Sequence, residues 1–307
     1  MKGKYTDRLL VLTFIFIFFF FLTAVVATPL LKVLHLETNS RYGLLTTSVI
    51  QNIIAFIIPS FVIAKFFTRR ASEFLCLKTA PNWKALIGVV IIYILGLPFL
   101  NQLIYWNSNI HFPEALSGIE NALRETELNI QAATSTMLDT TSIGGLMANL
   151  LIIALLTAFA EEIFFRGILQ TTIATNGRRV TAIWITAVIF SAFHFQALGF
   201  FPRLLLGAWF GYLLYWTRSL YAPVFAHFIN NGTVVVCTWL TLRGSNINFE
   251  MLGVSESGFP IMAIISCILI ALFLCYFKNI FFNNSKSKKI SENNNCENED
   301  ILKSAEK

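Results

Sequence analysis

The sequence predicts an all-α membrane protein, a bundle of about eight transmembrane helices that encloses a polar cavity within the membrane. Three observations carry this prediction. Hydrophobic residues make up 56% of the 307 residues and charged residues only 13%, about half the share usual in soluble proteins. The apolar residues are grouped in runs long enough to cross a bilayer, such as Leu9 to Ala27, which holds no charged residue. Polar and charged residues recur inside three later runs.

Eight apolar stretches are long enough, or nearly long enough, to span the membrane. The first is interpreted as a retained anchor, because an apolar run of about 19 residues exceeds the hydrophobic region of a signal peptide. The sixth stretch is short, and polar residues interrupt the seventh. The stretches cover residues 9–31, 44–67, 85–106, 146–170, 180–200, 203–217, 222–242 and 260–282.

The basic residues predict the orientation of the bundle. With the N-terminus in the cytoplasm, 17 of the 23 Lys and Arg residues fall on cytoplasmic loops and ends. The outer side keeps five, and Arg166 lies within a span. The basic residues flank apolar segments and form no single patch, so the net charge of +6 reports topology in a lipid bilayer and predicts no nucleic-acid partner. The five outer residues are Lys32, Arg41, Arg124, Arg203 and Arg243.

Four regions follow along the chain. Residues 1–144 contain three spans and an outer loop, in which the polar segment 111–141 is expected to form an amphipathic helix on the membrane surface. Residues 145–242 form the core that carries the polar motifs, and residues 243–282 contain the last span. Residues 283–307 are rich in Asn, Ser, Lys and Glu and are predicted to be a disordered cytoplasmic tail. The sequence contains no evident internal repeat, so it gives no support for the repeat architecture common in transporters.

Charged side chains in a membrane span are unfavourable and mark candidate functional sites. The fourth span contains Glu161, Glu162 and Arg166. Glu162 and Arg166 are spaced i and i+4 on a helix, which predicts a structural ion pair and leaves Glu161 without a local partner. The fifth span contains His194. In the seventh span His227 and Asn231 share one helix face.

These residue types suit the hydrolysis of an amide bond. Glu161 and His194 could hold and activate a water molecule, while His227 and Asn231 could donate to the developing oxyanion. No serine or cysteine lies in an evident nucleophile constellation, so attack by water is the simplest route. A zinc site with Glu161, His194 and His227 as ligands is the alternative. The metal-free mechanism, without a cofactor, is preferred because the sequence lacks HExxH and asparagine is a poor zinc ligand.

The motifs EExxxR at Glu161–Arg166, FxxxH at Phe190–His194 and HxxxN at His227–Asn231 occur in this order on successive apolar segments. Together they resemble the CAAX protease and bacteriocin-processing family of intramembrane glutamic endopeptidases, also called Abi proteins. The resemblance covers about residues 145–240. It implies an eight-helix bundle with a cavity open to the cytosol, with Glu161 and His194 activating water and His227 and Asn231 forming the oxyanion hole.

The substrate expected from this resemblance is a membrane-associated protein or peptide. The sequence favours a bacterial cell membrane, because the tail is rich in Asn and Lys and no organelle signal is present. Three alternatives remain open: a zinc-dependent CAAX-type metalloprotease, a non-catalytic bacteriocin self-immunity or peptide-binding protein, and a proton-coupled transporter. The substrate, its lipidation and the oligomeric state are not determined by the sequence.

Overall fold

The computed structural model describes residues 5–174, 178–246 and 248–282, and within these ranges the chain is helical and contains no strand. The all-α fold class is therefore confirmed. The predicted disordered tail, residues 283–307, lies outside the described residues. The four-region division of the chain stays a prediction.

Two long helices change their hydrogen-bonding pattern along their length. The second apolar stretch is α2 (Arg41–Gln51), η1 (Asn52–Ile57, a π-helix) and α3 (Ile58–Phe67). The fourth is α7 (Ile143–Asn149), η3 (Leu150–Leu156, π), α8 (Thr157–Glu162), η4 (Ile163–Gln170, π) and α9 (Thr171–Ile173). The remaining helices are α1 (Tyr5–Val33), α4 (Ala71–Phe74), α5 (Trp83–Ser108), α6 (Ser117–Leu138), α10 (Arg179–Ala192), α11 (Phe200–Thr217), α12 (Tyr221–Leu242) and α13 (Ile261–Phe282).

Each of the eight apolar stretches contains a helix. Five helical segments are long and apolar enough to cross a membrane by length and composition: Thr6–Val33, Arg41–Phe67, Trp83–Ser108, Ile143–Ile173 and Ala197–Thr217. The apolar helices Arg179–Ala192 and Ile261–Cys275 are shorter within the residues searched. Helix α12 is 22 residues long but carries His227, Asn230 and Asn231. The chain is a multi-pass membrane protein.

The fifth apolar stretch ends earlier than predicted. A helix was expected over 180–200, but α10 stops at Ala192, and the chain turns through Phe195, which has a left-handed backbone (φ 55°). A bulky residue rarely adopts this conformation, and strained backbone of this kind is found at functional sites. Because α10 has 14 residues, it rises only about 21 Å and falls short of a full span. His194 lies in this turn.

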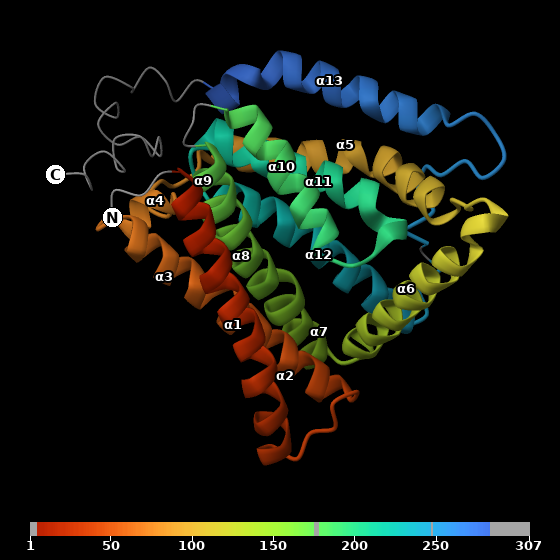
Figure 1. Ribbon diagram of the computed structural model, residues 1–307. Helices are drawn as coiled ribbons and strands as arrows, with labels where there is room; N and C mark the ends of the chain where they lie inside the picture. The colour runs from red at the N-terminus through yellow and green to blue at the C-terminus, as the bar shows by residue number, and fades with distance from the viewer. Residues whose placement is uncertain (1–4, 175–177, 247, 283–307) are drawn as a thin grey trace.

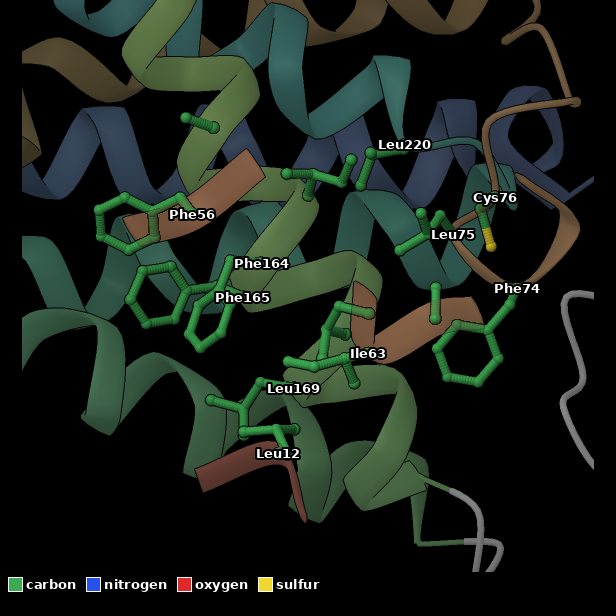
Figure 2. Packing of buried hydrophobic residues seen from close by; sticks show 14 of the residues in the cluster. Leu12, Phe56, Ile63, Phe74, Leu75, Cys76, Phe164, Phe165, Leu169 and Leu220 are labelled. Atoms are coloured by element: carbon green, nitrogen blue, oxygen red, sulfur yellow. The ribbon is translucent and has the colours of Figure 1, made fainter. Parts of the chain in front are cut away.

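A cluster of buried apolar side chains packs one face of η4 against α1, η1, α3 and α4. Figure 2 shows Phe164 and Phe165 of η4 beside Phe56 of η1, with Leu12 of α1 and Ile63 of α3 nearby. The Phe16 and Phe164 rings stack with centroids 4.4 Å apart. This packing holds the helix that bears the two glutamates against the N-terminal helices.

The two ends of the bundle differ in what covers them. Helices α4 and α9 lie near the start of α1, whereas α6 crosses the opposite end (Figure 1). At the α4 end the loops meet, because Leu220 N donates to Cys76 O at 3.1 Å. The polar segment predicted to be an amphipathic helix is α6. It packs against α2, α12 and the turn between α10 and α11.

Candidate active site

The helix that carries the first motif is built from alternating α and π turns, and both glutamates lie in the short α8 segment between η3 and η4. π turns release backbone carbonyls from the usual α-helical pattern. Two threonine hydroxyls donate to such carbonyls five residues back: Thr157 to Ile152 O at 3.1 Å and Thr171 to Arg166 O at 3.0 Å. Irregular π turns of this kind are frequent at functional sites.

Glu162 is the centre of a fully buried ion pair. Its side chain and that of Arg166 are both 0% exposed, and Arg166 Nη1 donates to Glu162 Oε1 at 2.7 Å. Arg166 Nη2 donates to Gly207 O in α11 at 2.9 Å. The same Glu162 oxygen lies 2.8 Å from His227 Nδ1. Because an ionised carboxylate can only accept, His227 donates from Nδ1 and its Nε2 faces the site.

Aromatic rings complete the shell around these charges. The Arg166 guanidinium lies 4.4 Å from the centroid of the Phe190 ring and 5.3 Å from that of Phe210, within the range of cation–π attraction. Phe210 also stacks on the His227 imidazole with centroids 5.0 Å apart. The Phe190 and His194 rings meet edge to face, with centroids 4.9 Å apart. The first residue of FxxxH is therefore the packing surface between the buried ion pair and the histidines.

Glu161 faces a different environment from Glu162. Its side chain is 14% exposed, and its Oε2 lies 4.0 Å from His194 Nε2 and 4.0 Å from His227 Nε2. Within the described part of the chain this buried oxygen accepts no hydrogen bond. Both distances are too long for a direct hydrogen bond and suit a single bridging water.

The turn after α10 fixes the orientation of His194. Its Nδ1 lies 2.8 Å from Phe190 O, and because a carbonyl can only accept, the ring donates from Nδ1. In the neutral ring the lone pair is then on Nε2, facing Glu161. A water between Glu161 Oε2 and His194 Nε2 would give one hydrogen to each acceptor and keep its oxygen lone pairs for attack on a substrate.

Asn231 lies one turn beyond His227 on α12. Its Nδ2 donates to Ile153 O in η3 at 3.4 Å, and its Oδ1 accepts from Asn230 Nδ2 at 3.2 Å. These contacts orient the amide and leave one Nδ2 hydrogen for a substrate. The structure therefore brings Glu161, His194 and His227 together. It places Asn231 four residues beyond His227 on α12, in contact with η3.

The zinc alternative requires a tighter donor set. Ligands about 2.0 to 2.2 Å from a tetrahedral zinc lie roughly 3.3 to 3.6 Å apart, whereas Glu161 Oε2 is 4.0 Å from each histidine Nε2. Across the residues that the structure describes, no group of three or more His, Cys, Asp or Glu side chains could hold a metal ion. The three residues do not fit zinc in this arrangement, and metal dependence stays a prediction to test.

Sequence reasoning did not identify Phe190 or Phe210 as neighbours of the site. The FxxxH motif contained a signal for Phe190, one helical turn before His194. Phe210 had none, because its contact with His227 depends on how α11 packs against α12.

The fold and the site define a multi-pass membrane protein with a buried cluster of carboxylate and imidazole groups. Residues 143–233 match the model of the family described as type II CAAX prenyl endopeptidase Rce1-like. All three motifs lie within the matched residues, and the match confirms the resemblance that they predicted.

One curated relative is the uncharacterised protein YpbD of Bacillus subtilis strain 168. It is 36% identical over 85 residues, which are 26% of this chain and 41% of the relative. The matched segment thus spans less than half of that relative. No solved structure matches the chain.

Proposed function

We propose that this protein is an intramembrane endopeptidase that hydrolyses a peptide bond of a membrane-associated protein or peptide. The proposal rests on one observation above all: Glu161 Oε2 is buried, accepts no hydrogen bond within the described structure and lies 4.0 Å from two histidine Nε2 atoms. An acceptor in this position is placed to take a proton from water. The Rce1-like match over 143–233 supports the same class of reaction.

In this mechanism Glu161 is the general base and His194 shares the water with it. The water oxygen attacks the scissile carbonyl carbon, and its proton passes to Glu161. The proton then moves to the departing amine nitrogen as the carbon–nitrogen bond breaks, which balances the hydrolysis. In the interior of the bundle few solvent molecules compete for the carboxylate oxygen, so it is free to accept the proton of the attacking water.

His227 and Asn231 stabilise the developing oxyanion. Asn231 donates from Nδ2. His227 donates from Nε2 when both ring nitrogens carry hydrogen, and Glu162 at Nδ1 is then the counter-charge, as an aspartate is for the histidine of a serine protease. Loss of one oxyanion donor lowers turnover by roughly 10² to 10³, and this is the expected effect of Asn231→Ala.

The experiment is a comparison of membrane peptides from cells that express the wild-type chain and cells that express Glu161→Gln. Mass spectrometry should find peptides whose new termini appear only with wild-type protein. The Glu125→Gln variant is a matched control, because Glu125 is an exposed residue of α6, and it should give the wild-type pattern. Identical peptides with wild-type and Glu161→Gln chains, both present at equal levels in the membrane, would refute the proposal.

A further inference from the structure

Two cavities lie beneath α6, and they define a surface we call the α6 groove. One has a volume of about 460 Å³ and reaches Asn230, and the other has a volume of about 850 Å³ and extends along α12 to Leu242. Both are lined by Glu127, Gln131, Arg203 and Val234. Because these residues are shared, the two cavities form one elongated depression between α6 and α12.

The α6 groove adjoins the candidate active site at two positions. Gln196, which lines the larger cavity, is two residues beyond His194 in the same turn. Asn230, which lines the smaller cavity, donates to Asn231 Oδ1 at 3.2 Å. A chain lying in the groove therefore passes the segments that carry two of the four site residues.

Glu127 lines this groove with a carboxylate of which only one oxygen accepts hydrogen bonds from the residues that the structure describes. Its Oε1 accepts from Gln196 Nε2 at 2.7 Å and lies 3.5 Å from Gln131 Nε2. Its Oε2 is shielded from solvent and accepts no hydrogen bond within the described structure. Leaving a buried carboxylate oxygen without a donor is unfavourable, so this atom is suited to a donor from a bound molecule.

The charge of the groove favours a cationic donor. Across the two cavities three carboxylates, those of Glu127, Asp139 and Glu250, lie with two guanidiniums, those of Arg124 and Arg203. Arg124 already donates to Glu120 and to backbone carbonyls. Arg203 already donates from both terminal nitrogens, to the backbone and side-chain oxygens of Gln196. Among the three carboxylates, Glu127 is the one with an oxygen, Oε2, that is buried and accepts no hydrogen bond within the described residues.

The shape and the lining suit an extended polypeptide. The lining extends along α6 and α12, and it mixes amide and carboxylate groups with apolar side chains such as Leu198 and Val234. A peptide backbone offers both donors and acceptors along its length and can use such a lining.

We propose that the α6 groove binds an extended segment of the substrate polypeptide that carries a lysine or arginine, with the basic side chain at Glu127. This inference rests on the proposed peptidase function for its substrate class. The substrate would then approach the site from the end of the bundle that α6 covers. The distribution of basic residues predicts that this end is on the outer side, whereas the family resemblance implies a cavity open to the cytosol. Glu127 is then a residue that selects the substrate sequence.

The test uses photo-crosslinking in detergent with Glu161→Gln, which removes cleavage. The photoreactive residue p-benzoylphenylalanine replaces Gln131, in the groove, or Asn129, an exposed α6 residue that lines neither cavity. The probes are a short biotinylated peptide of alternating leucine and lysine and its counterpart with glutamate for lysine. We expect the lysine peptide to label the chain at position 131 and not at 129, and the glutamate peptide to label neither.

Glu127→Gln should weaken labelling by the lysine peptide by at least about tenfold, because one charge-assisted hydrogen bond is lost. Glu125→Gln, the same change at an exposed position two residues away, should leave labelling unchanged. Equal labelling at positions 131 and 129, equal labelling by both peptides, or an unaffected Glu127→Gln chain would overturn the proposal. If Glu127→Gln does not fold, the comparison of the two peptides on Glu127 itself decides.

The outcome is separable from that of the proposed function. Labelling requires no cleavage, so the expected labelling pattern without any Glu161-dependent peptides would retain the groove and refute the peptidase. Glu161-dependent peptides without labelling at position 131 would retain the peptidase and refute the groove.

Discussion

Glu161 and Glu162 are neighbours in the chain with opposite surroundings. Glu162 is fully buried against Arg166 and His227, whereas Glu161 Oε2 faces two imidazoles and accepts no hydrogen bond within the described residues. The same residue type therefore has two different environments within one helical turn. We interpret Glu162 as a positioning residue and Glu161 as the base.

Substitution should separate the two roles. Glu161→Gln keeps the shape of the side chain but removes the proton acceptor, so turnover should fall by roughly 10² to 10⁴ with an unchanged melting temperature. Glu162→Gln leaves Arg166 buried without its counter-charge, which destabilises the fold by roughly 3 to 5 kcal/mol. The yield of folded protein in detergent should therefore fall before turnover does. Equal folding yields for both variants would contradict this assignment.

A double substitution provides the control for Glu162. Adding Arg166→Met to Glu162→Gln removes the unpaired charge, so part of the lost stability should return. The melting temperature in detergent measures this. A double variant less stable than Glu162→Gln alone would show that Arg166 stabilises the fold mainly through Gly207 O and the aromatic rings.

Metal removal tests the mechanism at the same site. Purified protein treated with a chelator, and shown by elemental analysis to be metal-free, is expected to keep its cleavage rate on a substrate found by the peptide comparison. Loss of activity, followed by recovery with one equivalent of zinc, would replace glutamate-activated water with zinc-activated water.

At the scale of elements, α11 packs closely against α10 and η4. The glycines of Gly207–Gly211 form a GxxxG motif, and a Cβ added at Gly211 would lie 2.7 Å from Gln170 Oε1 and 2.9 Å from Ile183 Cγ2. The backbone carbonyls of the same two glycines accept from Arg166 and Gln170. Glycine therefore permits both the close helix contact and the hydrogen bonds of the buried polar residues.

Gly211→Leu should consequently lower the melting temperature in detergent, because overpacking destabilises the folded state by about 1 to 3 kcal/mol. Gly144→Leu is the matched control, since no atom lies within 4 Å of a Cβ added there. Similar melting temperatures for the two variants would mean that the α11 face can move apart without loss.

The beginning of α6 should be sensitive to acid. Glu120 accepts from Phe112 N at 2.8 Å and from Arg124, and the backbone bond is the main reason that the pKa of this carboxyl falls from 4.5 to about 2. Since the folded form has the lower pKa, its stabilisation is complete above pH 4.5 and is lost as the pH falls towards about 2.

Amide hydrogen exchange at Phe112, corrected for the intrinsic rate, measures this contact. Protection should persist above pH 4.5 and decline below it. In the Glu120→Gln variant the Phe112 amide should exchange faster at neutral pH, and its exchange should lose most of the pH dependence. Constant protection down to pH 2 in wild-type protein would show that Glu120 does not hold this segment.

At the scale of the whole molecule, the distribution of basic residues predicts that both termini are cytoplasmic and that α6 is outside. A cysteine introduced at Ser117 should react with a membrane-impermeant maleimide on intact cells, and one at Ser285 should react only after lysis. The chain without an added cysteine measures the background from its native thiols. The reverse pattern would invert the orientation and place the α6 groove on the cytoplasmic side.

The sequence by itself determined the class of fold, the positions of the apolar helices and the three polar motifs. These are local properties: a run of apolar residues favours a membrane helix wherever it occurs, and an i, i+4 spacing places Glu162 beside Arg166 within one turn. The same reasoning missed the π segments and the early end of α10, because backbone hydrogen bonding at Phe195 and in η3 and η4 depends on neighbouring helices.

Only the tertiary structure decided what each polar group faces. The contacts of Glu162 with His227, of Arg166 with Gly207 O and of Gln196 with Glu127 join segments 41 to 69 residues apart. Spacing along one helix does not fix such contacts, since they follow from the rotation and depth at which helices pack. Hydrogen bonding to Glu162 and to Phe190 O then sets which nitrogen of each imidazole faces Glu161. The chemistry of the site is thus a property of the packed bundle, because it depends on distances between separate helices.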